Sequence, residues 1–148
     1  MNKGRLEAFS DGVLAIILTI MVLELHVPKD QARFADLAPV LPVLASYLLS
    51  FVNIGIYWNN HHHLLHATRR VDAAVLWANL HVLFWLSLVP FATGWMRENH
   101  FAPTPVSLYG FVMLMCAIAY WILQREIITE QGPESIVARA LVNHEEGG

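Results

Sequence analysis

Charge and cysteine are both scarce in this sequence. Asp, Glu, Lys and Arg make up only 14% of its 148 residues, whereas a soluble domain usually carries about 25%. The shortage of charge disfavours a soluble globule. The single cysteine, Cys116, cannot form an intrachain disulfide, so cysteine usage leaves the redox compartment undetermined.

Motifs of enzymes and of nucleic-acid-binding proteins are also missing. The sequence has no glycine-rich phosphate loop, no Ser-His-Asp order of the kind used in nucleophilic catalysis, and no internal repeat among its apolar blocks. Its net charge of −3 predicts no surface for DNA or RNA. We therefore expect neither an enzyme nor a nucleic-acid partner.

Long uncharged runs fill the chain instead. Hydrophobic residues make up 56% of it, and the mean hydropathy is +0.47. Four apolar blocks are each long enough to cross about 30 Å of hydrocarbon at roughly 1.5 Å per residue. The sequence predicts an all-α polytopic membrane bundle in residues 1–131 and a polar tail at 132–148, with four transmembrane helices at about 9–27, 37–66, 73–96 and 103–127.

One proline interrupts this pattern. Pro90 lies inside the third block, whereas the other prolines lie near block ends. Because proline has no N–H, it leaves a carbonyl of the preceding turn without its donor and kinks the helix. We expect a kink at Pro90, with Ser87 or a neighbouring helix satisfying the freed carbonyl.

The basic residues predict an orientation. If all four blocks span, Lys29, Arg33 and Arg97 fall on one side of the membrane and the other six fall on the side of the N-terminus. Since Lys and Arg favour the cytoplasmic side, we predict a multi-pass protein of the cell membrane with both termini in the cytoplasm. The six residues are Lys3, Arg5, Arg69, Arg70, Arg125 and Arg139.

The first block carries an apolar stripe with one hydroxyl. At roughly 100° per residue, Ile16, Ile20 and Leu23 lie within about 60° of one another, and Thr19 borders them. The stripe either faces lipid or core, with Thr19 donating to a carbonyl one turn earlier, or it faces an axis surrounded by several copies. In the second case the aliphatic rings would exclude water from a pore and the hydroxyls would bind a passing cation. The pattern alone leaves both interpretations open.

Two polar residues of the same block point elsewhere. Ser10 and Asp11 lie about 120° and 140° from Ile16, on opposite sides of the wheel. Polar groups at a hydrocarbon boundary need partners. We expect both side chains to face neighbouring helices.

The same residues carry a family resemblance. The motif Arg5-x-x-x-Phe9-Ser10-Asp11, followed by the series Ile16, Thr19 and Leu23, resembles the signature of the transmembrane protein 175 family of potassium channels, prokaryotic type. The resemblance is strongest over the first block and continues through the histidine cluster into the third.

That resemblance implies a potassium-preferring channel assembled as a homotetramer in the lipid bilayer, with K⁺ as the permeant ion and no cofactor. The first helix of each subunit would line the pore. Ile16 would form the narrowest hydrophobic gate, Ile20 and Leu23 further constrictions, and Thr19 the layer linked to potassium preference. Like the family, this sequence lacks the TVGYG loop of ordinary potassium channels.

The motif residues imply a structural role. By the resemblance, Arg5, Phe9, Ser10 and Asp11 would tie the first helix to its neighbours. From the third block and the histidine cluster, we expect His62, Asn79 and His81 to join this helix–helix network, while His61 and His63 are solvated near the interface.

One feature departs from the family pattern of six spans. After Gln124 the sequence is too rich in charge for another crossing, so the last two helices are missing. Either the chain is truncated or it is a divergent short member. The charged residues are Arg125, Glu126, Glu130, Glu134, Arg139, Glu145 and Glu146.

The histidines allow a rival function. His62 and His66 share a helical face at i, i+4 spacing, which suits zinc, and with His81 they could ligate a haem axially. Metal transport or membrane electron transfer would follow. We prefer the polar-network interpretation, because no second ligand pair has suitable spacing and intramembrane histidines commonly serve such networks.

Overall fold

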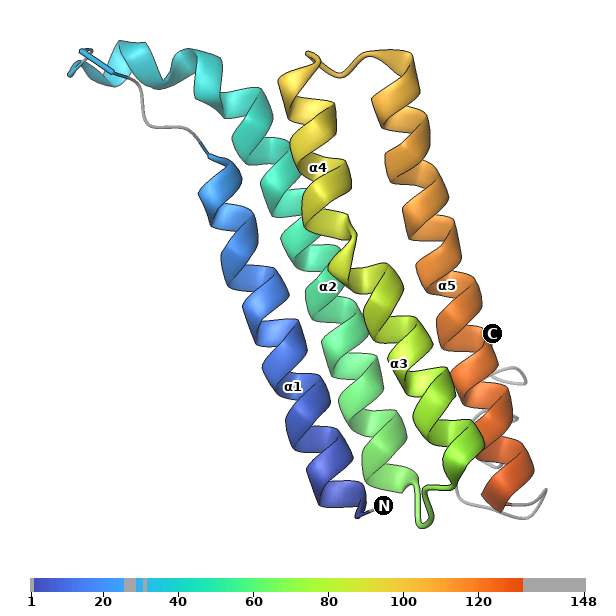
Figure 1. The fold of residues 1–148 in the computed structure, drawn as a ribbon. Coiled ribbons are helices and arrows are strands. Elements are labelled where there is room, and N and C mark those ends of the chain that lie inside the picture. Colours follow the sequence, from blue (N-terminus) through green and yellow to red (C-terminus); the bar gives the residue numbers. More distant parts are fainter. Residues whose placement is uncertain (1, 26–28, 31, 132–148) are drawn as a thin grey trace, which may run out of the picture.

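A computed structural model describes residues 2–25, 29–30 and 32–131 of the chain, and this part is helical with no strand. Its elements are α1 (Lys3–Ile20), η1 (Met21–Glu24), η2 (Phe34–Val40), α2 (Leu41–Ala67), α3 (Ala73–Ser87), α4 (Val89–Glu98) and α5 (Pro103–Gln131) (Figure 1). Four stretches are long and apolar enough to cross a membrane: Lys3–Leu23, Phe34–Ala67, Ala73–Glu98 and Pro103–Thr129. The predicted all-α bundle is confirmed, and the predicted tail at 132–148 lies outside the described residues.

The first helix begins earlier than the expected start near residue 9. The Asn2 side chain accepts a hydrogen bond of 2.7 Å from the Gly4 N–H, and this N-cap satisfies one of the free amides of the first turn. The helix therefore starts at Lys3 and includes the whole polar motif. At the other end it tightens into the 3₁₀ turn Met21–Glu24.

The third span is interrupted near Pro90, as the sequence predicts. α3 ends at Ser87 and α4 begins at Val89. Because Pro90 has no N–H for the Leu86 carbonyl, the Leu88 N–H turns to the carbonyls of Trp85 and Leu86. Ser87 does not donate to the Leu86 carbonyl; its hydroxyl donates at 2.6 Å to the Phe84 carbonyl, which the shifted Leu88 N–H leaves without its ordinary donor.

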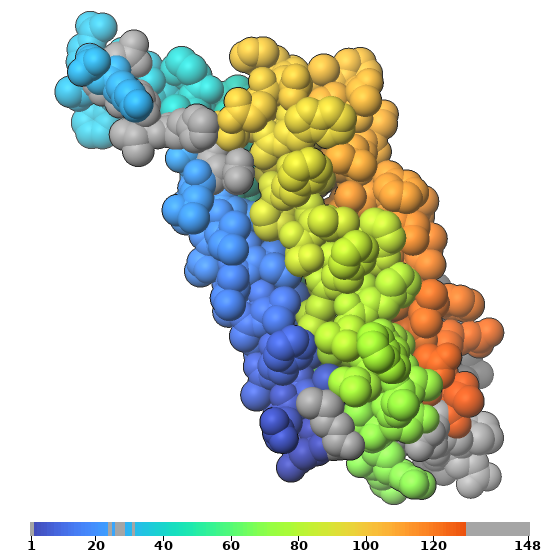
Figure 2. All heavy atoms as spheres, in the orientation of Figure 1, coloured from blue at the N-terminus to red at the C-terminus, as the bar shows by residue number. Residues whose placement is uncertain are grey.

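The bundle has two distinct ends (Figure 1). The start of α1, the α2–α3 connection and the last turns of α5 lie at one end, here called the proximal end, whereas η1, η2 and the α4–α5 connection lie at the distal end. In the space-filling view, α1 forms one edge of the molecule, and η2 projects sideways beyond it (Figure 2). The third span packs on α5, and α1 packs against α2 and α3.

The helix α5 buries one narrow row of residues. In α5 the row is Val112, Cys116, Ala119, Leu123 and Ile127, all 3% exposed or less. Spacings of three and four residues place the row on one face of the helix. Lipid tails are as apolar as these side chains, so the helices associate through close packing rather than through a hydrophobic driving force.

Ala119 is the residue most sensitive to size in this row, because it is fully buried in the core against which α3 packs. Ala119→Leu should wedge α3 from α5 and destabilise the fold by about 1–3 kcal/mol. Ala117→Leu, on the exposed face of the same helix, is the matched control and should leave stability unchanged. Thermal unfolding of the purified protein in detergent measures both, and equal melting temperatures for the two variants would contradict this packing.

Candidate functional site

The stripe singled out in the first helix lies on the face of α1 that the described residues leave uncovered. Ile16 is 58% exposed, Ile20 43% and Leu23 73%, and Thr19 is exposed between them. The buried row of α1 lies on the opposite side and faces the bundle: Leu6, Ser10, Leu14 and Ile17, continued by Met21 of η1. Three large aliphatic side chains and one hydroxyl thus form a continuous free surface.

Thr19 is oriented by its own helix. Its hydroxyl lies 3.0 Å from the Ala15 carbonyl oxygen and 3.1 Å from that of Ile16, to which it donates. A bond to a carbonyl one turn earlier is what the lipid-or-core interpretation of the stripe predicts for Thr19. A hydroxyl that donates its only hydrogen keeps acceptor lone pairs. Because Thr19 is exposed, this oxygen is available to water or a cation.

The polar end of α1 is tied to two other helices through an amide. The Asn79 Nδ2 of α3 donates to the buried Ser10 hydroxyl at 3.0 Å, and the Ser10 hydroxyl donates to the Leu6 carbonyl at 2.8 Å. On its other side, the Asn79 Oδ1 hydrogen-bonds the Nε2 of His61 on α2. Ser10 and Asn79 are fully buried and His61 is 2% exposed, so this network joins α1, α2 and α3 inside the bundle.

The histidine that enters this network is a correction to the sequence-based expectation. His61 was expected to be solvated, with His62 and His81 as the network members. His62 lies outside this amide network, although it contacts Glu7 of α1, and His81 accepts a hydrogen bond of 2.9 Å from the indole of Trp85 on its own helix. The helical periodicity of α2 could have identified His61, because this residue continues the buried row that includes Ser50 and Ile54.

A second, more exposed set of contacts joins α1 to α2. The Trp58 indole donates to the Asp11 carboxylate at 3.1 Å, and the His62 Nδ1 lies 3.2 Å from the Glu7 carboxylate. Asp11 therefore faces a neighbouring helix, as expected. Its partner is the Trp58 indole of α2.

Arg5 and Phe9 lie on the uncovered face of α1. Phe9 is 50% exposed and Arg5 is exposed. The physical reason is periodicity: Arg5, Phe9 and Ile16 recur at helical spacing and therefore share one face. The tie to neighbouring helices that the resemblance implies for these two residues stays a prediction.

The rival metal or haem site is not supported. Among the described residues, no group of three or more His, Cys, Asp or Glu side chains is arranged to hold a metal ion. The rings of His62 and His66 stack with centroids 6.1 Å apart, while His81 is engaged by Trp85. The histidines serve separate contacts.

Removing the buried histidine tests the network. His61→Ala deprives the Asn79 carbonyl oxygen of its partner and should destabilise the protein by about 1–3 kcal/mol. His63→Ala, two residues away and exposed, should change stability by less than about 0.5 kcal/mol. Thermal unfolding in detergent compares the pair. A larger effect from His63→Ala would refute the assignment of His61.

Comparison with known proteins supports the family resemblance. The family model described as endosomal/lysosomal potassium channel TMEM175 matches residues 5–90. A potassium channel of Chryseobacterium sp. is 56% identical over 141 residues, which cover 95% of this chain and 73% of that relative. A potassium channel of Streptomyces collinus is 38% identical over 128 residues, covering 81% of this chain and 62% of the relative, which is therefore considerably longer than the matched part.

A solved structure agrees with the fold. The crystal structure of a lysosomal potassium-selective channel TMEM175 homolog from Chamaesiphon minutus superposes with a TM-score of 0.76 at 30% identity. The match covers 99% of this chain and 80% of that one. With the family model spanning more than half of the chain and a relative matched over most of its length, this chain belongs to the TMEM175 family.

Proposed function

We propose that the chain is a subunit of a potassium-preferring cation channel in which α1 of each of four copies lines a central pore. The observation that carries the proposal is the uncovered stripe of α1, since it places Ile16, Thr19, Ile20 and Leu23 together on a face that the described residues leave free. The relatives from Chryseobacterium and Streptomyces are both named potassium channels. Four copies are what the family resemblance implies.

Symmetry explains why a free face suits a pore. Identical subunits related by rotation form a closed ring, so the same face of each α1 turns to the axis. Rings of Ile16, Ile20 and Leu23 would then narrow the channel with aliphatic groups, and such constrictions exclude water and stop ions. The buried row on the other side of α1 would keep the helix attached to its own subunit.

The Thr19 ring supplies the oxygen ligands of this pathway. Each hydroxyl donates to its own backbone, and its lone pairs are free to replace part of the hydration shell of K⁺. The permeant ion is the only ligand in this proposal, and no cofactor takes part.

The orientation follows from the proximal end. Lys3, Arg5, Arg69 and Arg70 lie in or beside the elements that meet there. Because basic residues favour the cytoplasmic side, we place the proximal end, with the start of α1 and the last turns of α5, in the cytoplasm of a cell whose plasma membrane holds the channel.

Ile16→Asn tests the gate. A polar ring wets more easily than an aliphatic one, so the current should rise for every monovalent cation without new selectivity. K⁺ and Na⁺ currents across planar bilayers containing the reconstituted full chain measure the effect. Leu114→Asn is the matched control, because Leu114 of α5 is 57% exposed, like Ile16 at 58%. If Leu114→Asn raises the current and Ile16→Asn does not, the stripe faces lipid.

Thr19→Val tests the ion ligand separately. The substitution keeps the shape of the side chain and removes its oxygen, so K⁺ should lose preference over Na⁺ while the oligomer stays intact. Reversal potentials under bi-ionic conditions report the permeability ratio, and native mass spectrometry reports the oligomer. Thr104→Val, an exposed threonine in the first turn of α5, is the control. If the K⁺/Na⁺ permeability ratio of Thr19→Val is unchanged, the Thr19 hydroxyl is not a ligand of the permeant ion.

A further inference from the structure

A cluster of hydroxyl groups joins three helices in the distal half of the bundle. The Ser50 hydroxyl of α2 lies 3.1 Å from that of Thr93 on α4 and 2.9 Å from that of Tyr109 on α5. Ser50 is fully buried and Thr93 is 4% exposed. No residue of this cluster belongs to the polar motif at the proximal end or to the uncovered stripe of α1.

The hydrogen bonds of the cluster have one consistent direction. Thr93 donates to the Val89 carbonyl at 2.7 Å, so its oxygen accepts from Ser50. Ser50 has then used its only hydrogen, and its oxygen accepts from Tyr109. The chain of donors runs from α5 through α2 to the first residue of α4. The Ser50 hydroxyl keeps both of these partners only while the three helices keep this arrangement.

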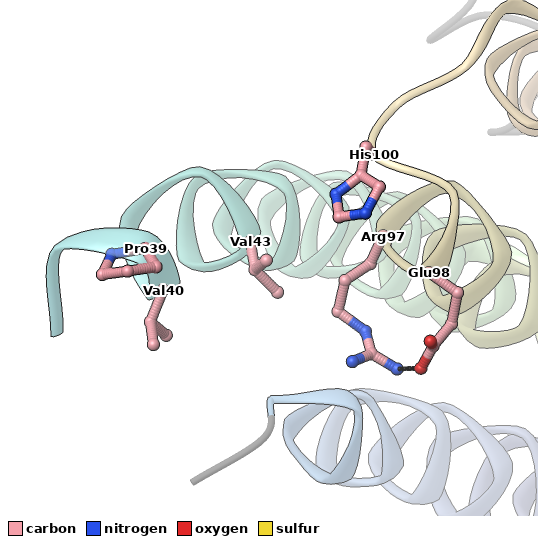
Figure 3. A pocket seen from close by; sticks show the side chains of 6 residues that line it. All are labelled: Pro39, Val40, Val43, Arg97, Glu98 and His100. Atoms are coloured by element: carbon pink, nitrogen blue, oxygen red, sulfur yellow. Dashed lines mark hydrogen bonds and ion pairs between the residues drawn. The ribbon is translucent and has the colours of Figure 1, made fainter. Parts of the chain in front are cut away.

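This attachment lies beyond the kink between α3 and α4. The turn at Leu88, caused by Pro90, interrupts the regular backbone hydrogen bonding between the two helices. Beyond Thr93, the end of α4 faces a cleft toward the start of α2 (Figure 3). Pro39, Val40 and Val43 form one wall of this cleft, and Arg97 and Glu98, which bond each other, form the opposite wall. Ser50 and Thr93 thus join α2 to α4 between a helix break and an open cleft.

The position of α4 is transmitted to the distal end of the proposed pore helix. α4 packs against η1, the 3₁₀ turn that continues α1. Met21 of η1 is 1% exposed and belongs to the same buried core as Val89 and Ala92 of α4. Two residues further on, Leu23 is 73% exposed on the opposite side of the turn. α4 is therefore in contact with the segment that carries Leu23.

From these contacts we infer that Thr93, with Ser50 and Tyr109, is a positioning residue for the Leu23 constriction. The inference rests on the proposed function, in which Leu23 narrows the distal part of the pore. The hydroxyl cluster fixes the position of α4, and α4 packs against η1. The position of η1 in turn sets the width of the Leu23 constriction. A hydrophobic constriction excludes water only while it is narrow. Loosening the attachment should let the ring wet and conduct.

The experiment is a set of single and double variants of the full chain in planar bilayers. Thr93→Val removes the hydroxyl and keeps the shape, and should raise the K⁺ current about threefold, the effect of losing one interhelical hydrogen bond in a membrane. Thr93→Ser should restore the original current. Thr68→Val is the matched control, because the buried Thr68 hydroxyl also donates to a carbonyl one turn earlier, that of Leu64 at 2.7 Å, but lies at the proximal end. It should leave the current unchanged.

The decisive measurement is coupling to the pore residue. In a Leu23→Ala background the constriction is already wide, so Thr93→Val should add nothing, whereas with Thr19→Val its effect should persist in full. An equal effect of Thr93→Val with and without Leu23→Ala would overturn the inference. Should Thr93→Val fail to assemble, Tyr109→Phe enters the same cycle, since it removes one partly buried hydroxyl of the cluster.

The two proposals fail in different ways. If Ile16→Asn and Leu23→Ala both leave the current unchanged, the pore lining itself is wrong and the inference falls with it. If they raise the current but Thr93→Val acts like Thr68→Val, only the positioning role of Thr93 is wrong.

Discussion

The Asn79 side chain is the contact on which the arrangement of the first three helices depends. In hydrocarbon, a buried amide without partners costs several kcal/mol, and Asn79 satisfies both its donor and its acceptor only between Ser10 of α1 and His61 of α2. One residue of α3 therefore fixes the rotation of two other helices. Apolar packing alone would specify this poorly, because lipid tails compete equally well for the same apolar faces.

The rotation of α1 has a direct consequence for function. With Ser10 held inside the bundle, Leu6, Leu14 and Ile17 are buried with it, and helical geometry turns Ile16 outward. A rotation by half a turn would bury Ile16 and leave the buried Asn79 amide without its Ser10 partner, which costs free energy inside the bundle. The rotation of α1 that buries Ser10 in the polar network is thus the same rotation that exposes the proposed pore surface.

The proximal and distal halves of the bundle are held in different ways. At the proximal end an amide and an imidazole lie between continuous helices, so α1 is fixed close to its N-terminus. At the distal end the third span is broken before Pro90, and the hydroxyls of Ser50 and Thr93 join its outer part to α2. The distal attachment consists of hydroxyl–hydroxyl bonds near an open cleft, so we expect adjustment of the proposed pore to occur in that half.

Much of the architecture was determined by the sequence alone. Uncharged runs of sufficient length predicted four spans and an all-α bundle, because only helices or closed barrels satisfy their backbone in lipid. Pro90 predicted the break in the third span, since proline is the one residue type that has no backbone N–H to donate. The 3.6-residue period of α1 also separated Ser10 from Ile16, and the structure keeps them on opposite faces.

The tertiary structure decided which polar groups meet. Three consecutive histidines differ by about 100° each on a helix, so the sequence could not tell which one faces α3, and the structure selects His61. It also leaves Arg5 on the uncovered face of α1, although the motif suggested a partner within the bundle. Hydrogen-bond partners depend on how two helices are rotated toward each other and how far each is shifted along its axis. The spacing of residues in a sequence gives the angles between residues of one helix, but not the orientation of that helix toward its neighbour.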